Sequence, residues 1–223
     1  MKPRVQIGTA AVPGGEELRL FQRADEYTIA LGLNELMSSR VSGSEEALAT
    51  MTCARLKTAA PNLLIGGYGM GFTLRAALAA LGAEARITVA ELVPEIIDWA
   101  RGPMAALTAG CLDDPRVKLV IGDVAEAIGG GIARYDAILL DVDNGPDGLT
   151  RAANDRIYSM QGLARAKAAL KPSGVVAIWS AAPDAKFSRR LTHAGFDVEE
   201  VFARASNTGK GARHVIWLAR PRA

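Results

Sequence analysis

Apolar and polar side chains alternate along the first forty residues with the two-residue period of β-strands. Residues 17–23 and 26–32 show this alternation on either side of a short turn, and residues 34–37 are compatible with a third strand. Strands joined by so short a turn are expected to pair directly with one another. We therefore predict a small N-terminal β-hairpin or meander over residues 1–43.

A helix start follows the predicted hairpin. Ser42 or Ser44 is a favourable N-cap residue, and Glu45 and Glu46 fall in the first turn, where the helix dipole stabilises negative charge. This helix is expected to lead into a second, larger domain over residues 44–223.

From residue 62 onward, short apolar runs alternate with helix-like stretches. Such alternation is typical of βαβ units with right-handed crossovers. Two last strands, joined by a polar loop, suit an antiparallel pair at one edge of the sheet. We therefore predict an α/β, Rossmann-like domain with a mostly parallel seven-stranded sheet and an antiparallel edge strand. The predicted strands lie near residues 62–66, 86–91, 117–121, 136–141, 174–180, 196–203 and 215–219.

Composition narrows the class of ligand. A net charge of +2 is too small to attract nucleic acid, and no apolar run approaches the roughly 20 residues that a membrane helix needs. The chain starts without an apolar leader, and Cys53 and Cys111 lack the spacing of metal ligands. We expect a cytoplasmic protein that acts on a small molecule, without nucleic acid, membrane or metal.

A glycine-rich turn is the strongest local signal in the chain. The apolar residues 63–65 fit a buried strand, and a helix-like run begins at about Phe72. Glycine permits positive φ and lets a ligand approach main-chain N–H groups near the start of a helix. The sequence therefore predicts a nucleotide-like ligand at this turn. Its glycines are Gly66, Gly67, Gly69 and Gly71.

Acidic residues follow three of the next strands, at the sheet edge where α/β proteins bind ligands. Glu91 lies roughly 20 residues after the turn, the spacing of a ribose-binding acid, although a first-turn acid beside Pro94 is the alternative. Asp123 suits either an exocyclic amine such as that of adenine or the N-cap of the next helix. Asp141 suits a base or amine-orienting carboxylate, or a loop cap.

The spacing of the glycines separates two kinds of ligand. In the nicotinamide motif G-x-G-x-x-G, counted from Gly67, the last glycine position would fall on Phe72. The segment Gly67-Tyr68-Gly69-Met70-Gly71 instead resembles the G-x-G-x-G of the class I S-adenosylmethionine-dependent methyltransferase fold. We expect Tyr68 either to flank a sulfonium with its ring or to be a surface residue of the turn.

Within that fold the chain resembles spermidine synthase-like proteins, the polyamine aminopropyltransferases of polyamine biosynthesis, over most of its length. The matching segments, besides the Glu91 strand, are Ile65-Gly66-Gly67 with Thr73-Leu74-Arg75, Pro115-Arg116-Val117 with Gly122-Asp123, Tyr135-Asp136-Ala137-Ile138 with Asp141, and Ala169-Leu170-Lys171-Pro172-Ser173-Gly174-Val175.

The resemblance implies S-adenosylmethionine or its decarboxylated form as co-substrate, a small acceptor such as an amine, and compatibility with a homodimer. Glu91 would hold the ribose, Asp123 the adenine, and Asp141 would accept the amine proton. We expect Leu92 and Val124, beside these acids, to complete the donor site.

The acceptor side follows from the same resemblance. Asp143 would assist Asp141 in catalysis, and Asn144 would contact the acceptor. Arg40 and Glu45 follow the β-hairpin that caps the site in the resembled family, and we expect them to border the acceptor pocket.

The donor stays open between two forms. Aminopropyltransferases carry an aspartate in the glycine turn, where this chain has Gly69. Gly69 leaves main-chain N–H groups open to a carboxylate, which favours ordinary S-adenosylmethionine and methyl transfer, whereas the overall resemblance favours aminopropyl transfer. A methyltransferase proper and a non-catalytic nucleoside-binding scaffold therefore remain the alternatives.

Overall fold

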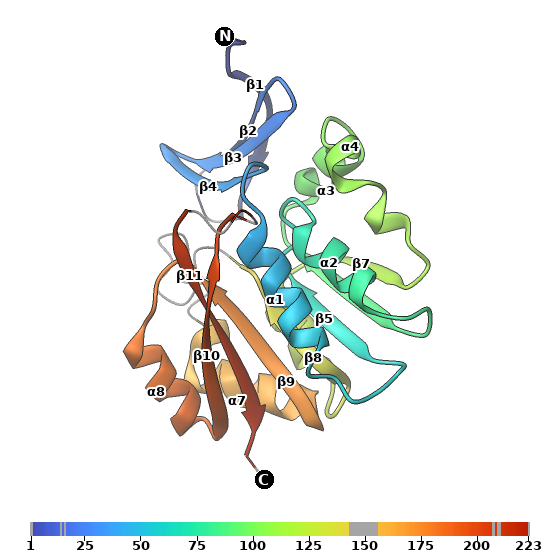
Figure 1. Ribbon diagram of the computed structural model, residues 1–223, viewed down its shortest axis with the longest axis vertical. Helices are drawn as coiled ribbons and strands as arrows, with labels where there is room; N and C mark the ends of the chain where they lie inside the picture. The colour runs from blue at the N-terminus through green and yellow to red at the C-terminus, as the bar shows by residue number, and fades with distance from the viewer. Residues whose placement is uncertain are drawn as a thin grey trace.

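The computed structural model describes residues 2–13, 15, 17–142, 156–206, 208 and 211–222. They form a four-stranded sheet near the N-terminus and a seven-stranded sheet that is covered by helices on both faces (Figure 1). The two termini lie at opposite ends of the long axis of the molecule (Figure 1). None of the helices in the described part of the chain is long and apolar enough to cross a membrane.

The small sheet is an antiparallel meander in the order β1-β2-β3-β4. Its last three strands fall where the alternating pattern predicted them, and β2 and β3 bury one row of side chains more deeply than the other. The strands are β1 (Val5–Ala11), β2 (Glu17–Arg23), β3 (Glu26–Leu31) and β4 (Asn34–Ser38).

The first strand was missing from the prediction. Of its seven residues only Ala10 is buried, while Val5 and Ile7 are exposed. An edge strand that buries so little shows no clear alternation of apolar and polar residues, so periodicity could not detect it.

The large sheet has the strand order β10-β11-β9-β8-β5-β6-β7. The strands from β9 to β7 are parallel, and β11 lies between β10 and β9, antiparallel to both. This confirms the predicted Rossmann-like sheet with its antiparallel pair at one edge. The strands are β5 (Asn62–Gly66), β6 (Arg86–Glu91), β7 (Val117–Ile121), β8 (Tyr135–Leu140), β9 (Leu170–Ser180), β10 (Phe196–Arg204) and β11 (Arg213–Pro221).

Helices cover the large sheet on both faces because its central strands are apolar on both sides. In β5, Leu63 and Ile65 join the core beneath α1, α2 and α3, whereas Leu64 joins the core beneath α5, α7 and α8. The helices are α1 (Gly43–Cys53), α2 (Phe72–Ala80), α3 (Pro94–Arg101), α4 (Ala105–Thr108), α5 (Val124–Gly129), α7 (Met160–Ala169) and α8 (Ala185–His193), with a 3₁₀ turn η1 (Cys111–Asp113).

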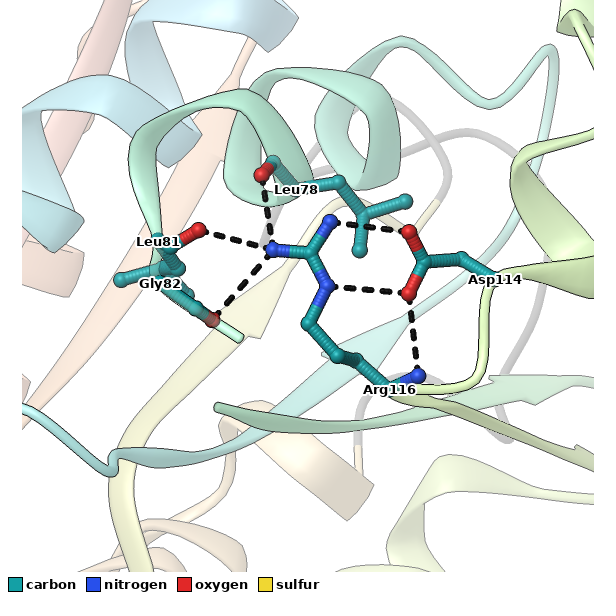
Figure 2. A network of polar contacts seen from close by, with 5 residues as sticks. All are labelled: Leu78, Leu81, Gly82, Asp114 and Arg116. Atoms are coloured by element: carbon teal, nitrogen blue, oxygen red, sulfur yellow. Dashed lines mark hydrogen bonds and ion pairs between the residues drawn. The ribbon is translucent and has the colours of Figure 1, made fainter. Parts of the chain in front are cut away.

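Arg116 joins the end of α2 to the loop before β7 (Figure 2). Its Nη1 donates to the carbonyl oxygens of Leu78, Leu81 and Gly82, at 3.0, 2.7 and 3.4 Å. Its Nε and Nη2 bind the two carboxylate oxygens of Asp114, at 2.9 and 2.8 Å, and this guanidinium holds the pKa of Asp114 at about 2. The last carbonyl groups of a helix lack intrahelical partners, and Arg116 supplies donors to them.

The small sheet is attached to the large domain through α3 and the turn after it. Trp99 of α3 packs so closely under Gly8 of β1 that a Cβ at Gly8 would lie 2.6 Å from the indole Nε1. The Tyr27 hydroxyl of β3 donates to the carbonyl oxygen of Pro103 at 2.5 Å. Apolar side chains of the small sheet, such as Leu20, belong to the same core as those beneath α1 and α2.

Gly8→Ala tests this attachment. The added methyl group would overlap the indole of Trp99, so we expect the free energy of unfolding in urea to fall by about 1–3 kcal/mol. Gly82→Ala is the matched control, because a Cβ at Gly82 meets no atom within 4 Å. Equal stability of the two variants would show that Trp99 does not hold the small sheet in this way.

Candidate active site

The glycine turn after β5 is shaped by positive φ angles at three positions. Gly67, Gly69 and Gly71 have φ of +83°, +54° and +78°. A Cβ at Gly67 would lie 2.6 Å from the carbonyl oxygen of Asp141, the residue that follows β8. Glycine is therefore required at position 67 both by its backbone conformation and by the close approach of the next strand end.

Glu91 ties this turn to the end of β6. Its Oε2 accepts a hydrogen bond from the backbone N–H of Tyr68 at 2.8 Å, and its Oε1 accepts one from Val93 at 2.9 Å. The residue is 5% exposed, and burial raises the pKa of Glu91, while these backbone donors act in the opposite direction. The backbone N–H groups of Gly69 and Leu92 also lower this pKa, so main-chain donors surround the Glu91 carboxylate.

Asp123 caps α5 with one of its oxygens. Oδ1 accepts from the backbone N–H of Ala125 at 2.8 Å, so the predicted capping role is observed. Oδ2 lies 3.9 Å from Nη2 of Arg156. Because capping uses Oδ1, Oδ2 keeps acceptor capacity for a ligand amine.

A cavity, called the main cavity below, lies between the strand ends and the small sheet. One wall holds Gly67 and Gly69 of the glycine turn together with Glu91, Leu92, Asp123, Val124 and Asp141, all of which were predicted for the donor site. The opposite wall comes from the small sheet and includes Leu18, Ile29, Leu31, Leu36 and Met37. The main cavity therefore pairs a polar, main-chain-rich wall with an apolar one.

A smaller cavity, called the side cavity below, adjoins the main cavity. Glu45 of α1 and Trp179 of β9 line it, together with Phe72. Four residues line both cavities: Leu36, Met37, Gly69 and Asp141. Asp141 therefore lies at the junction of the two cavities.

Asp141 is held in a partly buried place close to a second carboxylate. Its Oδ2 accepts a hydrogen bond from the Thr73 hydroxyl at 2.8 Å. Burial, and then the nearby charge of Glu45, raise the pKa of Asp141 to about 7, although the Thr73 hydroxyl opposes them. A carboxyl group with this pKa can both accept and release a proton near neutral pH.

Glu45 also belongs to a chain of hydrogen bonds. The Ser44 hydroxyl donates to Glu45 Oε2 at 2.6 Å, and Ser44 Oγ lies 2.8 Å from Nδ1 of His214. Burial raises the pKa of Glu45, whereas the Ser44 hydroxyl lowers it. The His214 ring packs edge-on against Trp179, with centroids 4.8 Å apart.

Gly66 and Gly71 line neither cavity, and two further predicted site residues have other surroundings. Arg40 is outside both cavities, and its side chain is half-exposed, with Nη2 4.0 Å from Glu35. Tyr68 is buried and lines the side cavity, and its hydroxyl lies 3.4 Å from Sγ of Cys111. The predicted residues Asp143 and Asn144 lie outside the described residues.

Several residues of the site were not predicted. The alternating pattern identified Leu18, Ile29 and Leu31 only as strand residues, because their position over the main cavity depends on how the two sheets meet. His214 falls just before the last predicted strand, 215–219, and was not among the predicted site residues. It is the second residue of β11, and an antiparallel strand begins at the edge where its parallel neighbours end. This rule of strand direction, applied to the predicted last strand, is the sequence signal that could have placed His214 near the site.

Together, the sheet order, the glycine turn and the acids after the strands define a class I methyltransferase-like fold with a cavity at the carboxyl ends of its parallel strands. The sequence model for the spermine/spermidine synthase domain matches residues 42–189, well over half of the chain. The protein therefore belongs to the spermine/spermidine synthase family.

Relatives of known name agree with this assignment. A polyamine aminopropyltransferase of Mycobacterium tuberculosis is 34% identical over 127 residues, which cover 56% of this chain and 23% of that protein. The chain thus matches less than a quarter of that relative. A crystal structure of spermidine synthase from Thermotoga maritima has the same fold, with a TM-score of 0.76 and 20% identity over 96% of this chain and 71% of that one. A spermidine synthase in complex with the transition-state analogue AdoDATO matches equally well.

Glu45 raises the pKa of Asp141 and Thr73 lowers it, so variants of these two residues should shift this pKa in opposite directions. Glu45→Gln removes a negative charge, so the pKa of Asp141 should fall from about 7 by about one pH unit. Thr73→Val removes a donor to the ionised carboxylate, so this pKa should rise. Titration of the Asp141 carboxyl carbon by NMR measures both shifts.

Glu46→Gln is the control for that titration, since Glu46 is the next acid on the same helix and does not line the side cavity. It should leave the pKa of Asp141 nearly unchanged. A fall as large as that in Glu45→Gln would mean that the charge of Glu45 has no special effect.

Proposed function

We propose that the protein transfers an aminopropyl group from decarboxylated S-adenosylmethionine to a small amine. The observation that carries the proposal is the position of Asp141, a carboxyl group with a pKa of about 7 at the junction of the two cavities. A group at that position can take a proton from an acceptor in the side cavity while the donor occupies the main cavity.

The main cavity suits the adenosyl part of the donor. Glu91 offers carboxylate lone pairs for the ribose hydroxyls, and Asp123 offers Oδ2 for the adenine amine. Leu92 and Val124 lie beside them and supply apolar contacts for the base. The glycine turn brings the donor close to the main chain.

The charges around the cavities favour the decarboxylated donor. Among the described residues that line them, the charged ones are all acidic: Glu45, Glu91, Asp123 and Asp141. The carboxylate of ordinary S-adenosylmethionine would bring a further negative charge to these acids, whereas the decarboxylated donor brings only an ammonium and a sulfonium.

The same charges favour an amine as acceptor. Two carboxylates close together in a partly buried place repel each other, and a bound ammonium group relieves that repulsion. In the reaction, the amine nitrogen attacks the aminopropyl carbon bonded to sulfur, and the C–S bond breaks. Its electron pair stays on sulfur, which leaves methylthioadenosine, and Asp141 accepts the proton of the attacking nitrogen.

Methyl transfer from ordinary S-adenosylmethionine is the second candidate, and one observation favours it. Gly69 lines both cavities and has no side chain to repel a donor carboxylate. Met37, however, covers this position, with its Cε and Sδ each 3.0 Å from where a Cβ would lie, and an apolar thioether is a poor partner for a carboxylate.

Turnover with both donors tests the proposal. With the decarboxylated donor and a panel of diamines, we expect methylthioadenosine release and an aminopropylated amine detected by mass spectrometry. Asp141→Asn should lower kcat by about 10²–10⁴-fold with donor affinity retained, because a general base is lost.

Two outcomes would contradict this function. One is a methylated product formed from ordinary S-adenosylmethionine while the decarboxylated donor gives no product. The other is binding of either donor without any turnover, which would indicate the non-catalytic scaffold.

A further inference from the structure

His214 lies behind Trp179 and Ser44, next to the side cavity, because of the direction of its strand. Val215 of β11 pairs with Ser180, the last residue of β9, so the start of β11 lies beside the end of β9. Parallel strands place their carboxyl ends at the ligand edge, and an antiparallel neighbour places its amino end there. Trp179 of β9, which lines the side cavity, packs edge-on against the His214 ring.

Hydrogen bonds connect this ring to Glu45 through Ser44. Ser44 has one hydroxyl proton and is fully buried, and its Oγ lies 2.6 Å from Glu45 Oε2 and 2.8 Å from His214 Nδ1. An ionised carboxylate can only accept, so the hydroxyl proton goes to Glu45. Ser44 Oγ must then accept from an Nδ1–H group, which fixes the tautomer of the ring.

The tautomer of His214 in turn determines that the Ser44 hydroxyl donates to Glu45. Burial lowers the pKa of His214, so the ring is neutral near neutral pH and carries its one proton on Nδ1. With Oγ occupied by that donor, the hydroxyl of Ser44 points to Glu45 and stabilises its ionised form. Without His214, the hydroxyl is free to turn away from the carboxylate.

We propose that His214, acting through Ser44, holds Glu45 as the carboxylate that binds an ammonium group of the acceptor. This role rests on the aminopropyl transfer proposed above. His214 is thus a positioning residue that sets the affinity for the amine. Asp141, on the other side of the same cavity, keeps the role of proton acceptor.

Steady-state kinetics separate this role from a purely structural one. His214→Phe keeps an aromatic ring against Trp179 but has no donor, so we expect the KM for the amine to rise about tenfold, with kcat and the donor KM nearly unchanged. His214→Asn places an amide N–H near the position of Nδ1 and should restore the KM. Equal losses in the Phe and Asn variants would overturn the proposal.

A double-mutant cycle tests whether His214 acts through Ser44. Ser44→Ala should raise the KM for the amine as His214→Phe does, and the double variant should be no worse than Ser44→Ala alone. Additive effects would mean that His214 acts on the acceptor or the fold by another route, and the proposal would fail.

Nitrogen-15 NMR provides a readout that does not need turnover. The chain has 2 histidines, so the ring signals of His214 can be assigned by comparison with a His193 variant. We expect the Nδ1–H tautomer in the wild-type protein and a shift toward the Nε2–H tautomer in Ser44→Ala. The Nε2–H tautomer in the wild-type protein would overturn the hydrogen-bond chain. Absence of any aminopropyl transfer with the expected tautomer present would instead refute the proposed function and, with it, the acceptor role of Glu45.

Discussion

The carboxylates of Asp141 and Glu45 both line the side cavity and are partly buried there. Burying two negative charges close together costs free energy, and the rest of the site depends on how this cost is offset. Burial raises the pKa values of both groups, and at Asp141 the negative charge of Glu45 adds to this effect. The structure offsets part of this cost with a hydroxyl donor to each carboxylate, Thr73 to Asp141 and Ser44 to Glu45. A proton or a positive ligand relieves the remaining repulsion, and this is the electrostatic basis of the proposed amine acceptor.

The close packing of the glycine turn places this acid pair next to the main cavity. The carbonyl of Asp141 approaches Gly67 so tightly that any side chain there would displace the end of β8. From the other side, Met37 of the small sheet lies over Gly69. In the proposed function, the donor would lie between the main chain of the large domain and the apolar wall from the small sheet, with Asp141 at the junction of the two cavities.

Much of this arrangement could be read from the sequence, and the reasons for the failures are physical. The central strands were predicted because both of their faces are apolar, and Glu91, Asp123 and Asp141 because parallel strands end at one edge. β1 buries too little to show a pattern. The wall formed by residues such as Leu31 depends on how two sheets meet, which no local period encodes.

The directions of individual side chains were also not predictable from the sequence. Arg40 was expected at the acceptor pocket from its place after the hairpin, but its side chain points to solvent near Glu35. His214 was passed over because a histidine beside a polar loop gives no local sign of a ligand edge. Its role depends on a strand that runs against its neighbours and on a contact with Ser44 that is 170 residues away in sequence.

The central claim is that the Asp141–Glu45 pair exists to receive a cationic amine. Calorimetric titration of 1,4-diaminobutane into the protein saturated with methylthioadenosine, at pH 7 in buffers of different ionisation enthalpy, measures the protons exchanged on binding. A bound ammonium group should lower the pKa of Asp141 from about 7, so we predict a net release of protons to the buffer, abolished in Asp141→Asn. Binding heats that do not depend on the buffer would contradict the claim.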